Sequence, residues 1–424
     1  MASDDLNNIA YNEKFFVDST CDDDETKLSQ RKVFINFITN SISHYTNHDV
    51  NKFTLKLSNP QTCSDTIERC IIFATQRGVK ELTLDFSNPK LNENNFDNHD
   101  VLFHLPKHIY QLGSSLESMK LYSCGFSMPE YFFKFSALKD VSLGYIEVRI
   151  DTLKTLLSSC RTIENLSLEK CWNLKHFDLG DEPIRLKKFV VDKCNIDSEY
   201  LKLNAPNLKY FKYCGVVFTS DINLRPHVIE EADIDFALES EFYERGNELC
   251  KILQDLFPAK ILRVCSYLLQ VVPSEDEPLR LQSELNVKHL ILKTAMHPNE
   301  FCGFEFLLNS CPFLEKLTLD IAPTLIFQDY TPPFDDMDLN KFWQSRRVIA
   351  QCLRRSLKVV EIVGSRATQD ELIAYCFFMQ AGRVLEHINI NLYNQDAFQE
   401  MRRGRAQLLL NSPKASKNLQ ISIK

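Results

Sequence analysis

The 424-residue sequence predicts an α/β solenoid of horseshoe form, with a parallel sheet on its concave side and helices on its convex side. Three observations lead to this prediction. A short apolar pattern recurs along the chain, adjacent copies of it start roughly 21 to 29 residues apart, and apolar residues at helical spacing lie between the copies. No single copy can bury its own apolar face, so neighbouring copies are expected to stack.

The recurring pattern is apolar, two variable residues, apolar, one variable residue, apolar. On a short strand its fourth and sixth positions point inward, whereas the third, fifth and seventh point outward. One match would mean little, but about a dozen at a sustained period indicate a repeat protein. Strong copies begin at Val79, Leu116, Leu138, Ile163, Leu186, Leu208, Val287, Leu314, Leu357 and Leu385, and weaker ones at Val50, Ile229 and Ile261.

Three copies carry cysteine at their ninth position, namely Cys124, Cys171 and Cys194. The leucine-rich repeat has Asn or Cys there, and its period covers the observed spacing. We therefore expect a leucine-rich repeat in which each of these thiols fills the tight turn after a strand.

The segments between strands are predicted to be helices. Leu153, Leu156 and Leu157 share one helical face, and similar faces occur at Ile67, Cys70, Ile71 and Ala74 and at Phe304, Leu307 and Leu308. Residues 33–42 have the same spacing and are the expected N-terminal cap, because the end of a solenoid otherwise exposes an apolar face.

Three parts of the chain are expected. Residues 1–48 form an N-terminal segment with the capping helix, residues 49–330 hold leucine-rich repeats, and residues 331–424 form C-terminal repeats. The polar stretch 88–100 is predicted to be an exposed loop, and the stretch 328–338, which contains Pro332 and Pro333, is the expected boundary.

Composition excludes several classes of function. With 49 Lys and Arg against 57 Asp and Glu, the net charge of −8 argues against general binding of nucleic acids or anionic membranes. The 14 cysteines are scattered without a CxxC pair, the N-terminus lacks the features of a signal peptide, and no apolar run approaches bilayer length. These features predict a cytoplasmic or nuclear protein with reduced thiols.

Catalytic signatures are also missing from the sequence. It contains no GxGxxG, P-loop or GxSxG motif. His104 and His108 have the spacing of a zinc-binding helix, but Pro106 lies between them and would break that helix. We therefore predict no catalytic residues, no metal site and no cofactor.

Outward positions of the strands are the candidate partner-binding residues. Tyr together with Lys on a rigid scaffold suits protein recognition, because Tyr offers a large contact area at a small entropic cost. The alternative is that these are simply the polar positions of half-buried strands. The candidates are Lys120, Tyr122, Asn165, Glu169, Lys188, Asp192, Tyr210, Lys212, Glu231, Asp233 and Asp235.

Three of these candidates form an acidic cluster. Glu231, Asp233 and Asp235 take the third, fifth and seventh positions of one repeat. They could receive a basic partner or a cation. Alternatively they form a solvated strand offset by Lys212, which holds the fifth position of the preceding repeat and should lie about 4.8 Å away.

The sequence resembles the plant F-box, leucine-rich-repeat and FBD proteins. The resemblance rests on CIIFATQRGVKELTL (residues 70–84), LKKFVVDKC (186–194), LNAPNLKYF (203–211) and FLLNSCPFLEKL (306–317), and residues 357–388 resemble the FBD module that ends many members. It implies a protein-binding arm of a cullin-type (SCF) ubiquitin ligase.

One departure from the family concerns the F-box, which docks the ligase adaptor and in the family precedes the repeats. Only about 14 residues precede Phe15, where the similarity begins, and neither Trp172 nor Trp343 lies in the context of the Arg-Trp segment of an F-box, so binding of the adaptor is in doubt. Three functions remain open. The first is a non-enzymatic protein-interaction scaffold. The second is a full ligase receptor whose F-box is missing from the gene model, and the third is a small-molecule (hormone) receptor.

Overall fold

The computed structural model describes residues 7–18, 23–46, 49–87, 103–125, 129–174, 176–196, 201–218, 222–224, 226–236, 238–277, 279–331, 341–345, 350–394 and 398–424. The chain divides into two compact units. Unit 1 comprises Met1–Ser198 and Lys202–Asn207, and unit 2 comprises Glu199–Leu201 and Leu208–Lys424. Each unit is described separately. The predicted loop at 88–100 and most of the predicted boundary at 328–338 lie outside the described residues.

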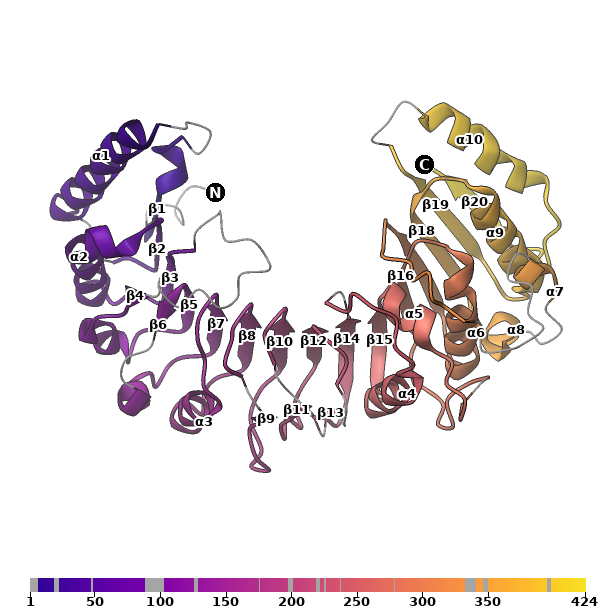
Figure 1. Cartoon of the computed structure of the whole chain (residues 1–424), viewed down its shortest axis with the longest axis horizontal. Helices are drawn as coiled ribbons and strands as arrows, with labels where there is room; N and C mark the ends of the chain where they lie inside the picture. The colour runs from indigo at the N-terminus through magenta and orange to yellow at the C-terminus, as the bar shows by residue number, and fades with distance from the viewer. Residues whose placement is uncertain are drawn as a thin grey trace. The chain divides into compact units, whose positions relative to one another are not determined.

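Unit 1 is built on a parallel sheet covered on one face by helices (Figure 1). Its strands, in spatial order, are β1 (Asn8–Asn12), β2 (Lys52–Lys56), β3 (Glu81–Asp85), β5 (Ser118–Tyr122), β7 (Asp140–Gly144), β8 (Asn165–Glu169) and β10 (Lys188–Asp192). The helices are α1 (Asp24–Ser43), α2 (Ser64–Gln76) and α3 (Ile150–Ser159), with short 3-10 turns η2 (Glu13–Phe15), η3 (Pro60–Cys63), η5 (Lys107–Leu112) and η6 (Pro129–Lys134). Short strands β4 (Phe103–His104), β6 (Cys124–Gly125) and β9 (Phe177–Asp178) lie in the connections.

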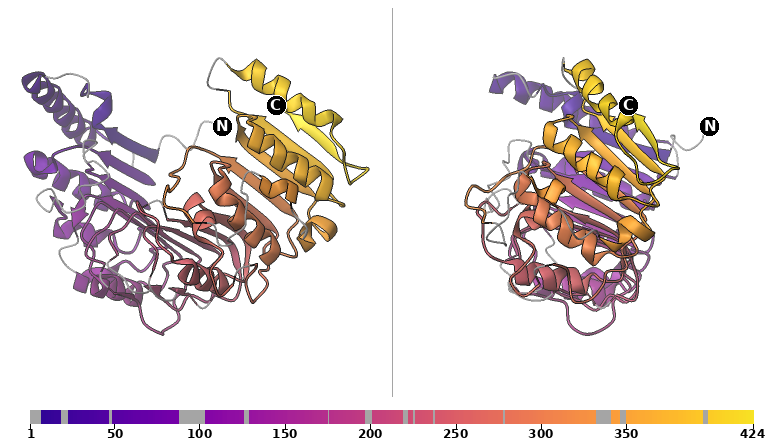
Figure 2. Two further views of the ribbon diagram at one scale, coloured as in Figure 1. Left: turned by 45° about the vertical axis from the view of Figure 1, so that its right-hand side comes forward. Right: turned by 90° about the vertical axis from the view of Figure 1, so that its right-hand side faces the viewer.

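Unit 2 repeats the arrangement, with α5, α6 and α9 on one face of its sheet (Figure 2). Its strands are β12 (Tyr210–Cys214), β14 (Ile229–Asp235), β15 (Ala259–Val264), β16 (His289–Thr294), β17 (Lys316–Ile321), β18 (Val359–Ser365), β19 (His387–Leu392) and β20 (Gln420–Ile423). Its helices are α4 (Gly246–Asp255), α5 (Ser266–Val271), α6 (Phe301–Ser310), α7 (Phe342–Ser345), α8 (Gln351–Arg355), α9 (Gln369–Ala381) and α10 (Gln399–Gln407). The connections add β11 (Leu201–Lys202), β13 (Ile222–Asn223), η7 (Pro298–Glu300) and η9 (Leu408–Asn411).

Burial along the strands confirms the predicted register of the repeat. Leu82 and Leu84 on β3 are buried, and they pair in register with Met119 and Leu121 on β5, which are buried as well. The residues between them face the side without helices. Because each strand buries its fourth and sixth positions, a slip by one residue would turn every apolar side chain to the wrong face.

The turn after several strands has a shared geometry. The eighth repeat position has a left-handed backbone at Ser123, Lys170 and Lys193, with φ of 54°, 47° and 50°. The ninth position is the buried thiol predicted from the sequence. The Cys124 thiol lies 3.1 Å from the Tyr122 carbonyl, and the Cys171 amide lies 3.4 Å from the Cys194 sulfur. The thiol therefore fills the turn and contacts backbone groups of the bend.

Two sequence predictions about the repeats were wrong. The weak copy at Ile261 begins two residues earlier, because β15 buries Ala259, Leu262 and Val264 and places Ile261 on the outward side. The pattern starting at Ile261 matches Ile261 and Val264 but not Ser266, in a strand that has apolar residues at successive positions. Not every connection contains a helix either, since strands β9 and β13 occupy the segments after β8 and β12.

The N-terminal segment contains the predicted helix and a strand that the sequence did not reveal. Helix α1 buries Phe34 and Ile38, whereas Val33 is 58% exposed although it was placed on the buried face. Strand β1 pairs in parallel with β2, and its Tyr11 ring packs against Phe37 and Phe53. Leu6, Ile9 and Tyr11 match the apolar pattern of the repeat, but this copy lies far outside the usual period from the copy at Val50 and was not predicted.

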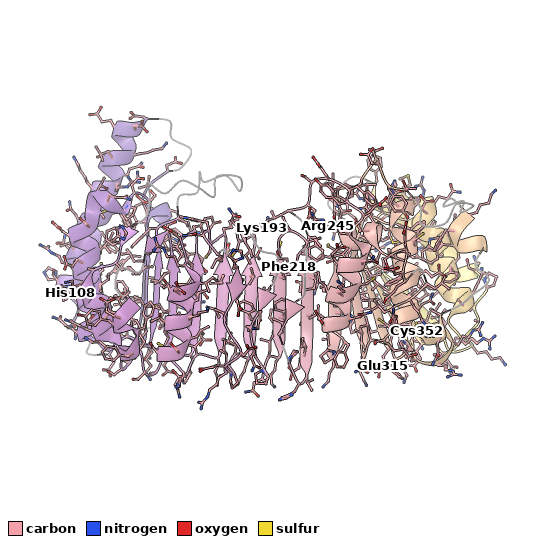
Figure 3. All side chains as sticks on the ribbon, turned by 60° about the horizontal axis from the view of Figure 1, so that its bottom comes forward. His108, Lys193, Phe218, Arg245, Glu315 and Cys352 are labelled. Carbon is pink, nitrogen blue, oxygen red and sulfur yellow. The ribbon has the colours of Figure 1, made fainter. Side chains whose placement is uncertain are left out.

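Charged residues occupy the second position of successive repeats, at the end of the sheet where the strands begin. In unit 1 these residues are, in order, Lys80, Glu117, Lys139, Glu164 and Lys187. The backbone amide of each one after the first donates a hydrogen bond to the backbone carbonyl of the previous one, in the neighbouring repeat. Lys139 and Glu117 are 2.8 Å apart, as are Lys187 and Glu164. In unit 2, Glu315, which precedes β17, pairs with Lys288 at 2.9 Å (Figure 3). We refer to these residues as the charge ladder.

Two buried carboxylates close turns between a strand and a helix in unit 2. Glu300 accepts hydrogen bonds from the Thr294 hydroxyl at 2.8 Å and the His297 amide at 2.8 Å. Glu371 makes the matching bonds to the Ser365 hydroxyl at 2.7 Å and the Ala367 amide at 3.1 Å. In both cases a hydroxyl at the end of a strand lies six residues before the glutamate. Burial raises the pKa of Glu300, against the lowering effect of these bonds.

The change Glu300→Ala should destabilise the chain by about 2–4 kcal/mol, because it leaves a hydroxyl and backbone amides buried without partners. The change Glu300→Gln should cost less, since the amide oxygen can accept part of the same bonds. Urea unfolding followed by circular dichroism measures both. The exposed Glu275→Ala is the control, and equal unfolding midpoints for all variants would contradict the role of the carboxylate.

Candidate functional site

The face of each sheet that carries no helices holds all the predicted partner-binding residues. In unit 1 they are Lys120 and Tyr122 on β5, Asn165 and Glu169 on β8, and Lys188 and Asp192 on β10. Lys188 pairs in register with Asn165, and Asp192 with Glu169. Lys120 and Lys188 are exposed, and the other four are half-buried. Strand β7 separates β5 from β8 and presents the smaller side chains of Ser142 and Gly144.

Gly144 determines how Tyr122 lies on this face. A Cβ atom at position 144 would meet the Tyr122 ring at 2.3 Å, so the ring occupies the space that glycine leaves over β7. There Tyr122 is flanked by Asp85 on β3 and Glu169 on β8. Burial, and then the charges of Glu169 and Asp85, raise the pKa of the Tyr122 hydroxyl. The face therefore holds a fixed aromatic ring between two carboxylates.

In unit 2 the remaining candidates lie on two adjacent strands. Tyr210 on β12 pairs in register with Glu231 on β14, and Lys212 pairs with Asp233. This is the neighbour relation that the sequence predicted for Lys212. Asp233 is 8% exposed, however, and is not the solvated residue that an offset acidic strand implied.

The carboxylates of β14 belong to a larger charged network that the sequence did not reveal. The Lys293 Nζ on β16 lies 3.0 Å from Asp235 Oδ2 and 3.5 Å from Asp233 Oδ1. Arg263 on β15 lies 3.8 Å from Asp233 Oδ2 through its Nε and 3.8 Å from Asp320 on β17 through an NH group. We call Asp233, Asp235, Arg263, Lys293 and Asp320 the charged network.

The two cations of the charged network reach across intervening strands. Lys293 on β16 crosses β15 to reach β14, and Arg263 on β15 crosses β16 to reach β17. Strands are spaced about 4.8 Å apart, so only a long side chain can span two spacings. Ile291 on β16 pairs in register with Arg263 and faces the side without helices. It is nevertheless only 7% exposed, because the Arg263 side chain crosses over β16.

The pKa values of Asp233 and Lys293 are set by burial and by the opposite charges around them. Burial raises the pKa of Asp233, and the charges of Lys293, Arg263 and Lys212 oppose that rise. For Lys293, burial lowers the pKa, but Asp235 and Asp233 outweigh it and the net pKa is raised. Asp233 and Asp235 therefore have cationic partners within the chain. A strand offset by neighbouring cations accounts for these two carboxylates better than a cation site does, although Asp233 is buried rather than solvated.

His289 lies on β16 beside the charged network. Its Nε2 is 2.9 Å from the Thr318 hydroxyl on β17. Burial, together with the neighbouring Lys316, lowers the pKa of His289 to about 4. The imidazole is therefore neutral at physiological pH, and its position is fixed by the threonine.

His104 and His108, which have the spacing of a zinc-binding helix, do not share a helix. His104 lies on β4, and His108 in η5 has its Nδ1 3.0 Å from Glu68 on α2. Among the described ranges, no group of three or more His, Cys, Asp or Glu residues has the arrangement of a metal site. Within those same ranges no helix is both long and apolar enough to span a membrane.

The repeated strand, the turn with a left-handed eighth position and the buried ninth position define a leucine-rich-repeat protein. A sequence model of the family described as "At1g61320/AtMIF1, LRR domain" matches residues 42–416. The chain belongs to this family.

Three relatives from Arabidopsis thaliana show how far the similarity extends. The putative F-box protein At3g29830 is 31% identical over 398 residues, which cover 91% of this chain and 83% of the relative. The F-box protein At3g62230 is 28% identical, covering 90% and 82%. The putative F-box/LRR-repeat protein At1g56400 is 30% identical, covering 89% and 78%. Further relatives carry FBD in their names, such as the FBD-associated F-box protein At1g61320. The resemblance to plant F-box, leucine-rich-repeat and FBD proteins is thus confirmed.

Replacing Gly144 by alanine should displace the Tyr122 ring and destabilise unit 1 by about 1–2 kcal/mol. The double change Gly144→Ala with Tyr122→Ala should cost less than the sum of the single changes, because the clash is gone. Urea unfolding of the four proteins in this cycle measures the coupling. Additive costs would show that the ring and the glycine do not interact.

Stability should depend on His289 between pH 6.5 and about 4. The unfolded imidazole takes up a proton below pH 6.5 whereas the folded one resists it down to about pH 4, so the contribution of His289 to stability is lost as pH falls through this window. After allowance for partial exposure, wild type should lose about 1–2 kcal/mol more than His289→Gln across the window. Urea unfolding at several pH values compares them. Parallel pH profiles would contradict this prediction.

Proposed function

We propose that this chain is a non-enzymatic protein-interaction scaffold that holds a partner protein on the helix-free faces of its sheets. The observation that carries the proposal is the geometry of these faces. Consecutive strands present Tyr, Lys, Asp and Glu side chains at fixed spacing, and several of these side chains are held by neighbouring strands. A surface organised before binding loses little conformational entropy when a partner arrives.

A second part of the proposal concerns ubiquitin ligases. The relatives carry F-box in their names, and F-box proteins of this kind resemble the substrate-recognition arm of an SCF-type ligase. We propose that the repeats of this chain serve as such an arm, stacked as a horseshoe solenoid. Residues 1–48 then cap the first repeat, residues 49–330 carry the repeats, and residues 331–424 form an FBD-like end.

The charge pattern favours a protein partner over a small anionic ligand. Arg263 and Lys293, the cations nearest the centre of the unit 2 face, are already paired with three carboxylates. A hormone or inositol phosphate receptor would need unpaired cations at such a position. A protein surface with charges of both signs can instead place each of its charges beside an opposite charge of this face.

The thiols support a cytoplasmic or nuclear location. The thirteen cysteines within the described residues are free, and all but Cys376 are buried. Burial raises the pKa of Cys70 to about 12 and of Cys352 to about 12, so these thiols remain protonated and unreactive. Free thiols at this density fit a reducing compartment.

Changing Lys120, Tyr122, Tyr210 and Lys212 to alanine together should abolish partner binding while the fold is kept. Proximity labelling in plant cells identifies the partner, and titration of the purified pair measures its affinity. We expect a loss of at least tenfold, because aromatic and cationic residues at the centre of an interface each contribute roughly 1–2 kcal/mol or more.

The matched control changes Tyr131, Lys134, Tyr243 and Lys251 to alanine, which removes the same residue types from surfaces outside the helix-free faces. This control should bind the partner as wild type does. If the two quadruple variants lost affinity equally, or if neither did, the proposed binding face would be wrong.

A further inference from the structure

A second surface of unit 1 has features of a binding groove, and it lies away from the helix-free face. The groove has a volume of about 670 Å³ and lies between the C-terminal half of α3, the segment 179–185 after β9, and Pro206 and Asn207. All of these residues belong to unit 1. Its size is in the range of sites that receive a ligand or a short peptide segment.

The rim of the groove is basic. Lys154 on α3, Arg161 just after α3 and Arg185 on the opposite wall line it, and all three are exposed. None of them has an ion pair with a carboxylate of the described residues. They differ in this from the two cations of the charged network, whose charges are met by carboxylates of the same chain. Glu182 is the one carboxylate in the lining.

The floor and walls of the groove are apolar. Leu157, Ile163 and Leu179 form the floor, and Pro183, Ile184 and Pro206 stand along the walls. The hydroxyls of Thr155 and Ser158 on α3 bond to carbonyl groups of their own helix, at 2.8 and 3.2 Å. The unpaired polar groups of the lining are therefore mainly cationic, above an apolar base.

We propose that this groove binds an acidic peptide segment of a partner protein, with an apolar side chain inserted between α3 and Ile184. The carboxylates of such a segment would pair with Lys154, Arg161 and Arg185, and the apolar side chain would cover the floor. This binding surface is distinct from the helix-free face, so the chain could hold one protein at two places or two proteins at once.

The apolar floor favours a peptide over a compact polyphosphate. An inositol phosphate needs charged or polar groups on all sides, whereas Leu157, Ile163 and Leu179 offer it none. The net charge of −8 for the whole chain does not oppose an acidic peptide here, because charges beyond about 8 Å are largely screened at physiological salt.

Selection from a randomised eight-residue peptide library on the immobilised full chain tests the proposal. We expect enrichment of peptides in which Asp and Glu surround a Leu, Ile or Phe. A selected peptide made synthetically should lose at least tenfold in affinity on the combined change Lys154→Glu, Arg161→Glu and Arg185→Glu, because each lost pair is replaced by a repulsion. It should also bind more weakly to Ile184→Ser.

The matched control reverses the charge of three other exposed cations of unit 1 through the combined change Lys32→Glu, Arg69→Glu and Lys107→Glu. The net charge of the chain changes by the same amount as in the first triple variant. This control should keep the affinity of wild type, and thermal melts should show that every variant is folded. The proposal is overturned if the enriched peptides are not acidic, if both triple variants weaken binding equally, or if inositol hexakisphosphate binds the groove more tightly than the selected peptide.

Discussion

Parallel pairing of short strands is the interaction on which the rest of this structure depends. A single strand such as β7, of five residues, leaves both of its backbone edges and its apolar face unsatisfied. Pairing with β5 and β8 on either side satisfies the edges, and the shared register brings Leu121, Leu143 and Leu168 into one buried row. Once this row is formed, the register of the strands fixes which outward side chains are neighbours. The composition of the helix-free faces follows from the packing of the core.

The sequence could predict most of this arrangement because the strand pattern is local. Alternation over six residues reveals which positions are buried, and repetition removes the ambiguity of any one copy. Prediction failed where the local signal was weak. Ile261 was aligned wrongly because β15 has apolar residues at successive positions. Strand β1 was missed because its copy of the pattern, Leu6, Ile9 and Tyr11, lies far outside the usual period from the copy at Val50.

Interactions that span several strands could not be predicted in the same way. The sequence placed Lys212 opposite Asp233, because adjacent repeats can be aligned by counting. The reach of Lys293 to Asp235 and of Arg263 to Asp320 depends on rotamers and on the side chains in between. The same holds for the basic groove of unit 1, whose walls come from irregular segments after β9 and around Pro206 that the repeat pattern does not describe. The six-residue spacing from hydroxyl to glutamate at Thr294 and Ser365 also occurs between Thr75 and Glu81, where the Thr75 hydroxyl bonds within its own helix, so spacing alone could not reveal these turns.

The charge ladder has a consequence for how the number of repeats can change. In unit 1, lysine and glutamate alternate strictly from Lys80 to Lys187 on strands that are direct neighbours. Removing one of the three inner repeats, those of Glu117, Lys139 and Glu164, would place two residues of like charge side by side, whereas removing two adjacent inner repeats would keep the alternation. Duplication of inner repeats follows the same rule. The ladder thus gives this run a parity, because its alternation survives only when inner repeats are gained or lost in pairs.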